Sequence, residues 1–340
     1  MRPIGVLYEN EAWLEPTFAS LDAVGAPYER LFAADAVFDP AAGAPEWSLA
    51  VNKISPSSYL RDHAPAIGFG RAFLPFLEGC GVPVVNGSAA FDLETSKARQ
   101  LLLLGALGVR APSARVITHP SLAARAAEGL RFPVIVKPNV GGSGALMRRF
   151  ETLDELRAGT AAIDLGPDRT GLVQEYLASG DGSIVRIEFL DGEFLYAIRI
   201  TNERDEDFNL CPADICDVEL ASPPENPGGT RRAASPATFD NNPLDAPAKR
   251  PLRIEAFDPP GEMIDTVLRI ARAGRLDVGG VEYLVAARDA LPYVYDINAL
   301  SNFVTDAPSL VGFDPHARFA RWLVARASRT STRQLAEAVR

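Results

Sequence analysis

The stretch FPVIVKPNVGGSG, residues 132–144, brings a lysine and a run of small residues directly behind a strand-like segment. Its β-branched residues 134–136 predict a buried strand that ends at Lys137. The segment that follows contains Gly141, Gly142, Ser143 and Gly144. Glycine lets backbone N–H groups approach phosphate oxygens, and a lysine adds a compact positive charge, so this order suits a nucleoside triphosphate. The same pattern is also typical of an ordinary surface turn.

The composition is that of a globular enzyme with small-molecule partners. The chain has 340 residues, of which 47% are hydrophobic and 23% charged, enough for two or three compact units. Lys and Arg number 34 against 44 Asp and Glu, a net charge of −10. Because no basic cluster offsets this charge, the sequence disfavours nucleic acid and anionic membranes as partners.

The cysteines and the N-terminal segment indicate a reduced, cytoplasmic protein. Cys80, Cys211 and Cys216 make no disulfide framework, and MRPIGVLYENEAW lacks the apolar region of a signal peptide. No apolar run reaches transmembrane length. Cys211 and Cys216 lack a second pair or a nearby histidine, so two half-buried thiols are favoured over a metal site.

The periodicity divides the chain into three blocks. Residues 1–92 alternate strands at 4–8, 49–51 and 82–85 with a helix near 14–24, which predicts a small doubly wound α/β unit. Residues 93–172 predict a compact α+β lobe that carries the glycine loop. Its expected elements are helices at 96–107, 121–129 and 153–158 and strands at 115–118, 133–137 and 145–150.

The third block, residues 173–330, contains two expected hairpins. Residues 183–190 and 193–200 alternate cleanly around Asp191-Gly192, a strong two-residue turn signal. An unbroken register from this turn puts apolar side chains on one face, namely Val185, Ile187, Phe189, Phe194, Tyr196 and Ile198. It puts the charged ones on the other face, namely Arg186, Glu188, Glu193 and Arg199. A solvated polar face is the alternative interpretation.

The second hairpin, residues 281–285 with 293–297, carries acidic side chains. Asp296 and Asn298 are two apart and project to the same side, and Glu282 can face them from the partner strand. Two carboxylates and a carboxamide are the oxygen ligands that Mg²⁺ prefers, with nucleotide phosphates completing its shell. Acidic residues beside a turn also simply improve solubility, which is the competing explanation.

Five segments taken in order resemble the ATP-grasp superfamily and, within it, the RimK-type carboxylate–amine ligases. They are VVNGSAAFDLETSKARQLLLLGALGV, VIVKPNVGGSG, LVQEYLASGDGSIVRI, GVEYL and YVYDINALSNF, and the resemblance covers residues 80–305. It implies an ATP-grasp fold with an N-terminal α/β domain, a small central lid lobe and a C-terminal antiparallel-sheet lobe. It also implies ATP and Mg²⁺, or Mn²⁺, as cofactors.

The resemblance assigns roles residue by residue. Lys97, Lys137 and the glycine loop correspond to phosphate-binding groups, and Glu282, Asp296 and Asn298 to metal ligands. Arg186 and Arg199 correspond to the cations that hold the transferring phosphoryl group and the later oxyanion. The adenine-binding hinge corresponds to Glu175, Tyr176 and Leu177, and the ribose-binding acid to Asp181. The implied activity joins a carboxylate to an amine of an amino acid or short peptide, and a homo-oligomer is compatible with it.

Departures from the family pattern concern the metal and the substrate. Glu282 stands where aspartate is more usual, and Asp296 where glutamate is. The usual proline-containing turn after Asn298 is replaced by Ala-Leu-Ser-Asn, which makes Ser301 and Asn302 candidate substrate residues. Asn209, in FNLCPADIC, is another. Residues 217–255 are rich in proline and predict a long inserted loop.

The segment SLAVNKISPSSYLRDHAP follows a strand of the N-terminal block and supplies two further substrate candidates, Lys53 and Arg61. They lie at the carboxyl end of the expected sheet, where open α/β sheets bind ligands. A loop that merely caps the next helix is the alternative.

Two other functions fit the same residues. A small-molecule kinase would use the same nucleotide and metal groups but stop at phosphoryl transfer. A nucleotide-binding module without catalysis would need a defective metal site, and Asp296 and Asn298 argue against that. The amine requirement separates the ligase from the kinase.

Overall fold

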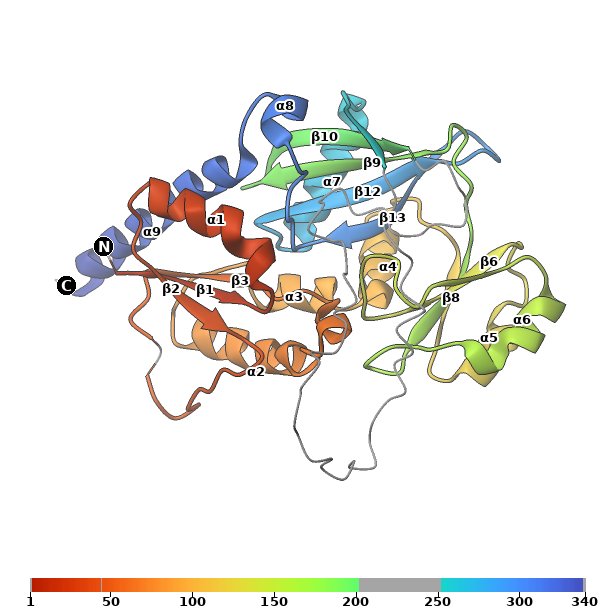
Figure 1. Cartoon of the computed structure of the whole chain (residues 1–340), viewed down its shortest axis with the longest axis horizontal. Helices are drawn as coiled ribbons and strands as arrows, with labels where there is room; N and C mark the ends of the chain where they lie inside the picture. The colour runs from red at the N-terminus through yellow and green to blue at the C-terminus, as the bar shows by residue number, and fades with distance from the viewer. Residues whose placement is uncertain (1, 44, 202–251, 339–340) are drawn as a thin grey trace, which may run out of the picture.

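The computed structural model describes residues 2–43, 45–201 and 252–338, which form three β-sheets with flanking helices (Figure 1). The predictions for Asn209, Cys211 and Cys216, and most of the expected insertion at 217–255, lie outside the described residues. A search of the described residues for a helix with the length and hydrophobicity needed to span a bilayer finds none.

The first sheet is parallel, with strand order β2-β1-β3-β4. Its strands are β1 (Ile4–Tyr8), β2 (Tyr28–Phe32), β3 (Leu49–Lys53) and β4 (Val84–Val85). Helices α1 (Glu11–Ala23) and α9 (Pro315–Ala338) pack on one face and α2 (Pro65–Gly79) on the other (Figure 1). The expected doubly wound unit is therefore confirmed. The periodicity misses β2 because its sequence, YERLF, is only partly buried.

Two helices lead from the first sheet to the second, α3 (Ser88–Glu94) and α4 (Lys97–Ala106). The helix expected at 96–107 corresponds to α4, which begins where the Ser96 side chain accepts a hydrogen bond from the Arg99 N–H. The expected block boundary at 92 falls inside α3, and the boundary at 172 falls inside β8.

The second sheet is antiparallel, with order β5-β8-β6-β7. Its strands are β5 (Ala114–Ile117), β6 (Val134–Pro138), β7 (Arg148–Phe150) and β8 (Gly171–Glu175). One face is covered by η2 (Pro120–Leu122), α5 (Ala123–Ala126), α6 (Leu153–Gly159) and η3 (Thr160–Ala162). The strand expected at 145–150 is too long, because Ser143 and Leu146 have positive φ and the chain turns there before β7 begins.

The third sheet is antiparallel, with order β11-β10-β9-β12-β13. Its strands are β9 (Ser183–Leu190), β10 (Glu193–Thr201), β11 (Arg253–Ala256), β12 (Val278–Val285) and β13 (Pro292–Asn298). Helix α7 (Gly261–Ala273) covers one face, and the other joins the core of α1 and α9. The end of the expected insertion is wrong, since residues 253–255 pair with β10 as part of β11. Two short helices, η1 (Ser58–Arg61) and α8 (Ala307–Val311), complete the described elements.

A β-bulge overturns the predicted face of Arg199. The hairpin begins as expected, with Glu193 opposite Leu190, but the register shifts between Phe194 and Tyr196. Beyond the shift, Ile198 lies opposite Arg186 and Arg199 lies opposite Val185. One extra residue exchanges the two faces of a strand. Tyr196 and Ile198 therefore share the face of Arg186, and Arg199 lies on the opposite face.

Asn86 ties the first sheet to the third. Its Nδ2 donates to the carbonyls of Val278 at 2.8 Å and Ala299 at 2.5 Å, and its Oδ1 accepts from the N–H of Asp277 at 2.8 Å. The side chain is 1% exposed, and the residue has a φ of 49°, which asparagine tolerates better than most residues. This amide fixes the start of β12 and the segment after β13 to the end of β4.

We expect Asn86→Ala to lower the free energy of unfolding by roughly 2–4 kcal/mol, because several buried backbone groups lose their partners. Asn86→Gly keeps the positive φ accessible and should also be destabilised, which separates the amide from backbone strain. Urea unfolding followed by circular dichroism measures both. The control is Leu102→Ala, at a residue 75% exposed. Midpoints for both Asn86 variants equal to that of the control would contradict the assignment.

Candidate active site

A cavity with a volume of about 240 Å³ is lined by residues of the second and third sheets and by residues 55–57, which follow β3 of the first sheet. Many of its lining residues were predicted from the sequence. The members are Lys97, Lys137, Gly141, Gly142, Ser143, Gly144, Glu175, Tyr176, Leu177, Arg186, Glu282, Asp296, Asn298 and Asn302. Residues separated by up to about two hundred positions thus form one site.

Two lysines reach the cavity from neighbouring elements. Lys97 is the first residue of α4, and its Nζ lies 2.7 Å from Asp296 Oδ1. Burial lowers the pKa of Lys97, but the charge and hydrogen bond of Asp296 outweigh this effect and raise it. Lys137 lies in β6 and is 4% exposed. Burial, followed by the nearby charge of Lys97, lowers the pKa of Lys137 to about 7.

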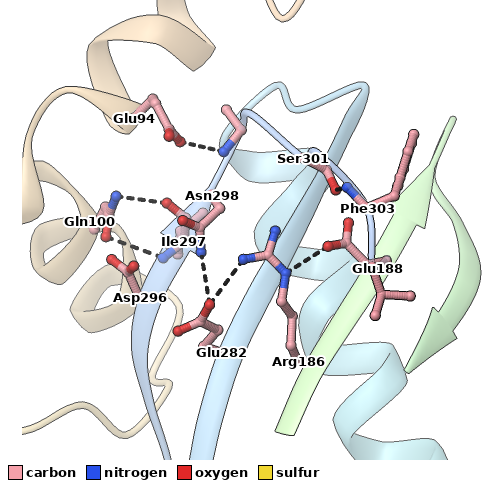
Figure 2. A network of polar contacts seen from close by, with 12 residues as sticks. Glu94, Gln100, Arg186, Glu188, Glu282, Asp296, Ile297, Asn298, Ser301 and Phe303 are labelled. Carbon is pink, nitrogen blue, oxygen red and sulfur yellow. Dashed lines mark hydrogen bonds and ion pairs between the residues drawn. The ribbon is translucent and has the colours of Figure 1, made fainter. Parts of the chain in front are cut away.

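The acidic residues lie together as expected (Figure 2). Glu282 in β12 is directly opposite Asp296 in β13, and Asn298 Nδ2 donates to Glu282 Oε1 at 3.5 Å. Burial raises the pKa of Glu282, against the opposing effect of Arg186. This set of two carboxylates and one carboxamide oxygen fits a hard cation such as Mg²⁺. Both carboxylates are held by cations of the chain itself, Lys97 and Arg186.

Arg186 lies at the cavity wall, whereas Arg199 does not. The Arg186 Nη1 is 2.9 Å from Glu282 Oε1, and its Nε is 2.6 Å from Glu188 Oε1. Burial lowers the pKa of the guanidinium, but the charges of Glu188 and Glu282 outweigh burial, so the pKa is raised. Arg199 instead packs over the Phe257 ring at 4.2 Å and lies 3.9 Å from Glu255. The structure therefore brings only one of the two expected catalytic arginines to the site.

The expected nucleotide hinge lies at the end of β8. The Glu175 carboxylate accepts from Arg288 Nη1 at 2.9 Å and from the Arg131 N–H at 3.0 Å, which fixes the segment 175–177 beside the cavity. Asp181 accepts hydrogen bonds from Ser179 and Ser183, and those from Ser183 lower its pKa most. The lining includes both serines but not Asp181, whose predicted ribose contact stays a prediction.

The two N-terminal substrate candidates have partners inside the protein. Lys53 Nζ donates to the Ser301 carbonyl at 2.5 Å, and burial lowers the Lys53 pKa to about 8. Arg61 forms an ion pair with the buried Glu9 at 2.6 Å. Neither cation lines the cavity, so direct substrate contact by them is not supported. The same segment instead contributes Ser55 and Ser57, which periodicity did not single out.

At the substrate end, the two C-terminal candidates differ. Ser301 is fully buried, and its carbonyl accepts a hydrogen bond from Lys53 Nζ. Ser301 therefore contributes to the packing of the segment after β13. Asn302 lines the cavity, and its buried Oδ1 has no partner among the described residues. Sequence analysis also missed Glu94, which lines the cavity and accepts from the Ala299 N–H. Burial raises the Glu94 pKa to about 7. The sequence signal that could have identified Glu94 is its position three residues before Lys97.

Comparison with known proteins identifies the architecture. No family model matches the chain. The ATP-grasp ligase PsnB in complex with a minimal precursor superimposes with a TM-score of 0.63 and 18% identity, covering 96% of this chain and 100% of PsnB. The chain has the ATP-grasp fold. A RimK-domain ATP-grasp protein from Sphaerobacter thermophilus DSM 20745 gives a TM-score of 0.62 and 16% identity, covering 94% of this chain and 98% of that one.

A match in sequence accompanies the ATP-grasp fold. D-alanine–D-alanine ligase from Haemophilus influenzae (strain PittEE) is 29% identical over 168 residues, which is 44% of this chain and 55% of that ligase. The match therefore spans about half the length of this curated relative. Another PsnB structure contains Mg and ADP together with its minimal precursor. The expected three-part ATP-grasp architecture is confirmed.

The Lys137 environment yields a prediction that needs no substrate. In an NMR titration with ¹³Cε-labelled lysine, we expect the signal lost in Lys137→Arg to titrate near pH 7. Lys97→Met should raise this midpoint because it removes a nearby positive charge, and Asp296→Asn should lower it because it removes a nearby negative one. Lys53 is the internal control, because neither residue is among the causes of its shift. Midpoints for Lys137 that stay fixed in both variants would rule out this electrostatic arrangement.

Proposed function

We propose that the protein is an ATP-dependent carboxylate–amine ligase that forms an amide or peptide bond and releases ADP and phosphate. One observation carries the proposal: a single cavity collects two lysines, Arg186 and three oxygen ligands on an ATP-grasp fold. The similarity to D-alanine–D-alanine ligase supports the same reaction class. Amino acids or short peptides are the proposed substrates, because a PsnB structure contains a precursor peptide and the curated relative is named a D-alanine–D-alanine ligase.

The nucleotide would lie between the second and third sheets. Ile135, Leu177 and Leu284 provide apolar walls for the adenine beside the 175–177 backbone. Lys97 and Lys137 would neutralise charge on the phosphates. The negative phosphates would raise the pKa of Lys137, so that its amine would be fully protonated in the complex. Glu282, Asp296 and Asn298 would hold Mg²⁺ or Mn²⁺, and the bound metal would supply Lewis-acid stabilisation of the phosphate charge.

The ligase reaction needs a carboxylate converted to a better electrophile. An amine cannot displace oxide from a carboxylate, so transfer of the γ-phosphoryl group first gives an acyl phosphate, and attack by the amine then releases phosphate. Arg186 would hold the transferring phosphoryl group and then the tetrahedral oxyanion. No side chain forms a covalent bond in this scheme, so the residues act by placement and charge compensation.

The glycine loop would exclude water from the acyl phosphate. A Cβ at Gly141 would lie 3.1 Å from the Tyr59 hydroxyl, and one at Gly142 would lie 3.7 Å from Ser57 Cβ. The loop thus packs closely against the N-terminal segment that also contributes Ser55 and Ser57 to the cavity. Closure at this position shields a reactive intermediate from hydrolysis.

We expect ADP release in the presence of ATP, Mg²⁺ and a panel of glycine, the other nineteen amino acids in both enantiomers, and short peptides. A ligase needs both a carboxylate and an amine for sustained turnover, and added hydroxylamine should trap the acyl phosphate as a hydroxamate. Coupled ADP detection and ³¹P NMR measure these products. A stable phosphorylated product that forms without an amine would identify a kinase instead, and no release above the ATP-only rate would refute catalysis on these substrates.

Asp296→Asn should leave the fold intact and lower metal-dependent turnover by roughly 100-fold or more, because a bound metal supplies several kcal/mol of transition-state stabilisation. The control is Asp265→Asn, an exposed acid on α7. Circular dichroism verifies the fold, and ADP release at limiting Mg²⁺ measures the effect. Near wild-type turnover in Asp296→Asn would place the metal elsewhere.

A further inference from the structure

Arg186 extends from β9 toward Glu282 on the neighbouring strand β12 (Figure 2), and both residues line the cavity. In the pairing of β9 with β12, Arg186 lies opposite Glu282 and Glu188 lies opposite Gly280. All four residues therefore share one face of the sheet. The guanidinium extends over Gly280, with one carboxylate on each side of it.

The two carboxylates that hold Arg186 differ in their access to the cavity. Glu282 lines the cavity and is also a proposed metal ligand. Glu188 is 1% exposed and does not line the cavity. Its Oε1 is 2.6 Å from Arg186 Nε, and its Oε2 has no hydrogen-bond partner among the described residues. A carboxylate this deeply buried depends on a paired cation, so separation from Arg186 would leave its charge uncompensated.

Gly280 provides the space in which the guanidinium lies. A Cβ at this position would be 2.8 Å from Nε and from Nη2 of Arg186, and 2.8 Å from Glu188 Oε1. Protein Cβ atoms do not approach other heavy atoms this closely, so any side chain here would displace the ion pair. Gly280 is not among the residues with positive φ. Its lack of a side chain therefore serves the guanidinium and not an unusual backbone conformation.

These observations indicate different roles for the two carboxylates. A metal that binds Glu282 would compete with Arg186 for the same carboxylate, since Arg186 Nη1 contacts its Oε1. The Glu188 bond is out of reach of such a metal. Arg186 would then keep one fixed partner while the other is exchanged.

We propose that Glu188 and Gly280 are positioning residues that hold the Arg186 guanidinium at the cavity wall when Glu282 turns to the metal. This proposal rests on the proposed function, because Arg186 is the cation assigned to the transferring phosphoryl group. Neither positioning residue needs to touch a substrate. Their effect is to fix the place of the cation before the reaction begins.

The ¹⁵N–¹H resonance of Arg186 Nε tests the proposal without any substrate, and its loss in Arg186→Lys assigns it. We expect this N–H to exchange slowly with solvent in the wild type, and to stay slow when Mg²⁺ and ADP are added. Glu188→Gln and Gly280→Ala should each speed its exchange by roughly tenfold or more, because the charge-assisted bond is weakened or displaced. Gly105→Ala is the matched control, because a Cβ there would meet nothing within 4 Å.

Turnover supplies the second measurement, with the amino acid or peptide pair that gives the fastest ADP release in the wild type. Glu188→Gln and Gly280→Ala should lower kcat by roughly 10- to 100-fold with less than about twofold change in the KM for ATP, because misplacement of a catalytic group affects the chemical step. Glu188→Asp should recover part of the loss. A purely structural role would instead lower the thermal midpoint without this split between kcat and KM.

Three outcomes would overturn the proposal: an unchanged Nε exchange rate in both variants, a wild-type kcat in both, or loss of the slow Nε signal when Mg²⁺ and ADP bind the wild type. If Glu188→Gln fails to fold, Gly280→Ala still decides the question, since it keeps every charge. A wild type that releases no ADP with any substrate refutes the proposed function, and the exchange measurements then decide the positioning role alone.

Discussion

A connected set of buried charges at the cavity holds this site together. Lys97 pairs with Asp296, Asp296 lies opposite Glu282, and Glu282 pairs with Arg186, which is held in turn by Glu188. Burial of such charges costs free energy unless each has a partner, and removal of a single member leaves its neighbour uncompensated. The arrangement is therefore a poor source of stability, and under the proposed function the phosphates of a nucleotide and a metal would replace the internal partners.

The segment after β13 is fixed by groups from the N-terminal half of the chain. Glu94 accepts from the Ala299 N–H, Asn86 donates to the Ala299 carbonyl, and Lys53 donates to the Ser301 carbonyl. These contacts hold the end of the cavity beside this segment in place against the first sheet. Two of the three donors or acceptors are ionisable and fully enclosed, and burial shifts both of their pKa values toward neutrality. The packing of the N-terminal unit against the third sheet thus determines the shape of this end of the cavity.

Local patterns in the sequence predicted the elements that carry the chemistry. The alternation in residues 183–190 and the Asp-Gly turn gave β9 its bounds, and Ser96 marked the start of α4. The β-bulge at residue 195 left no comparable signal, because its side chains alternate as in a regular strand while the hydrogen-bond register shifts. The exchange of faces that moved Arg199 away from the cavity could therefore not be predicted from periodicity.

The sequence by itself determined which chemical groups were available and in what order, because strand alternation, helix caps and glycine turns depend on neighbouring residues. Lys137, the glycine loop and the acidic hairpin follow from such local rules, whereas Lys97 was identified through the resemblance to the ATP-grasp superfamily. Only the tertiary structure decided which cations face the cavity. In the sequence, Lys53 and Arg61 are cations that follow a strand, as Lys137 is. In the structure, however, Lys53 binds the Ser301 carbonyl and Arg61 pairs with Glu9, away from the cavity. The physical reason is that a buried charge is placed by its partner, and Lys53 and Ser301 are separated by 248 positions in the chain.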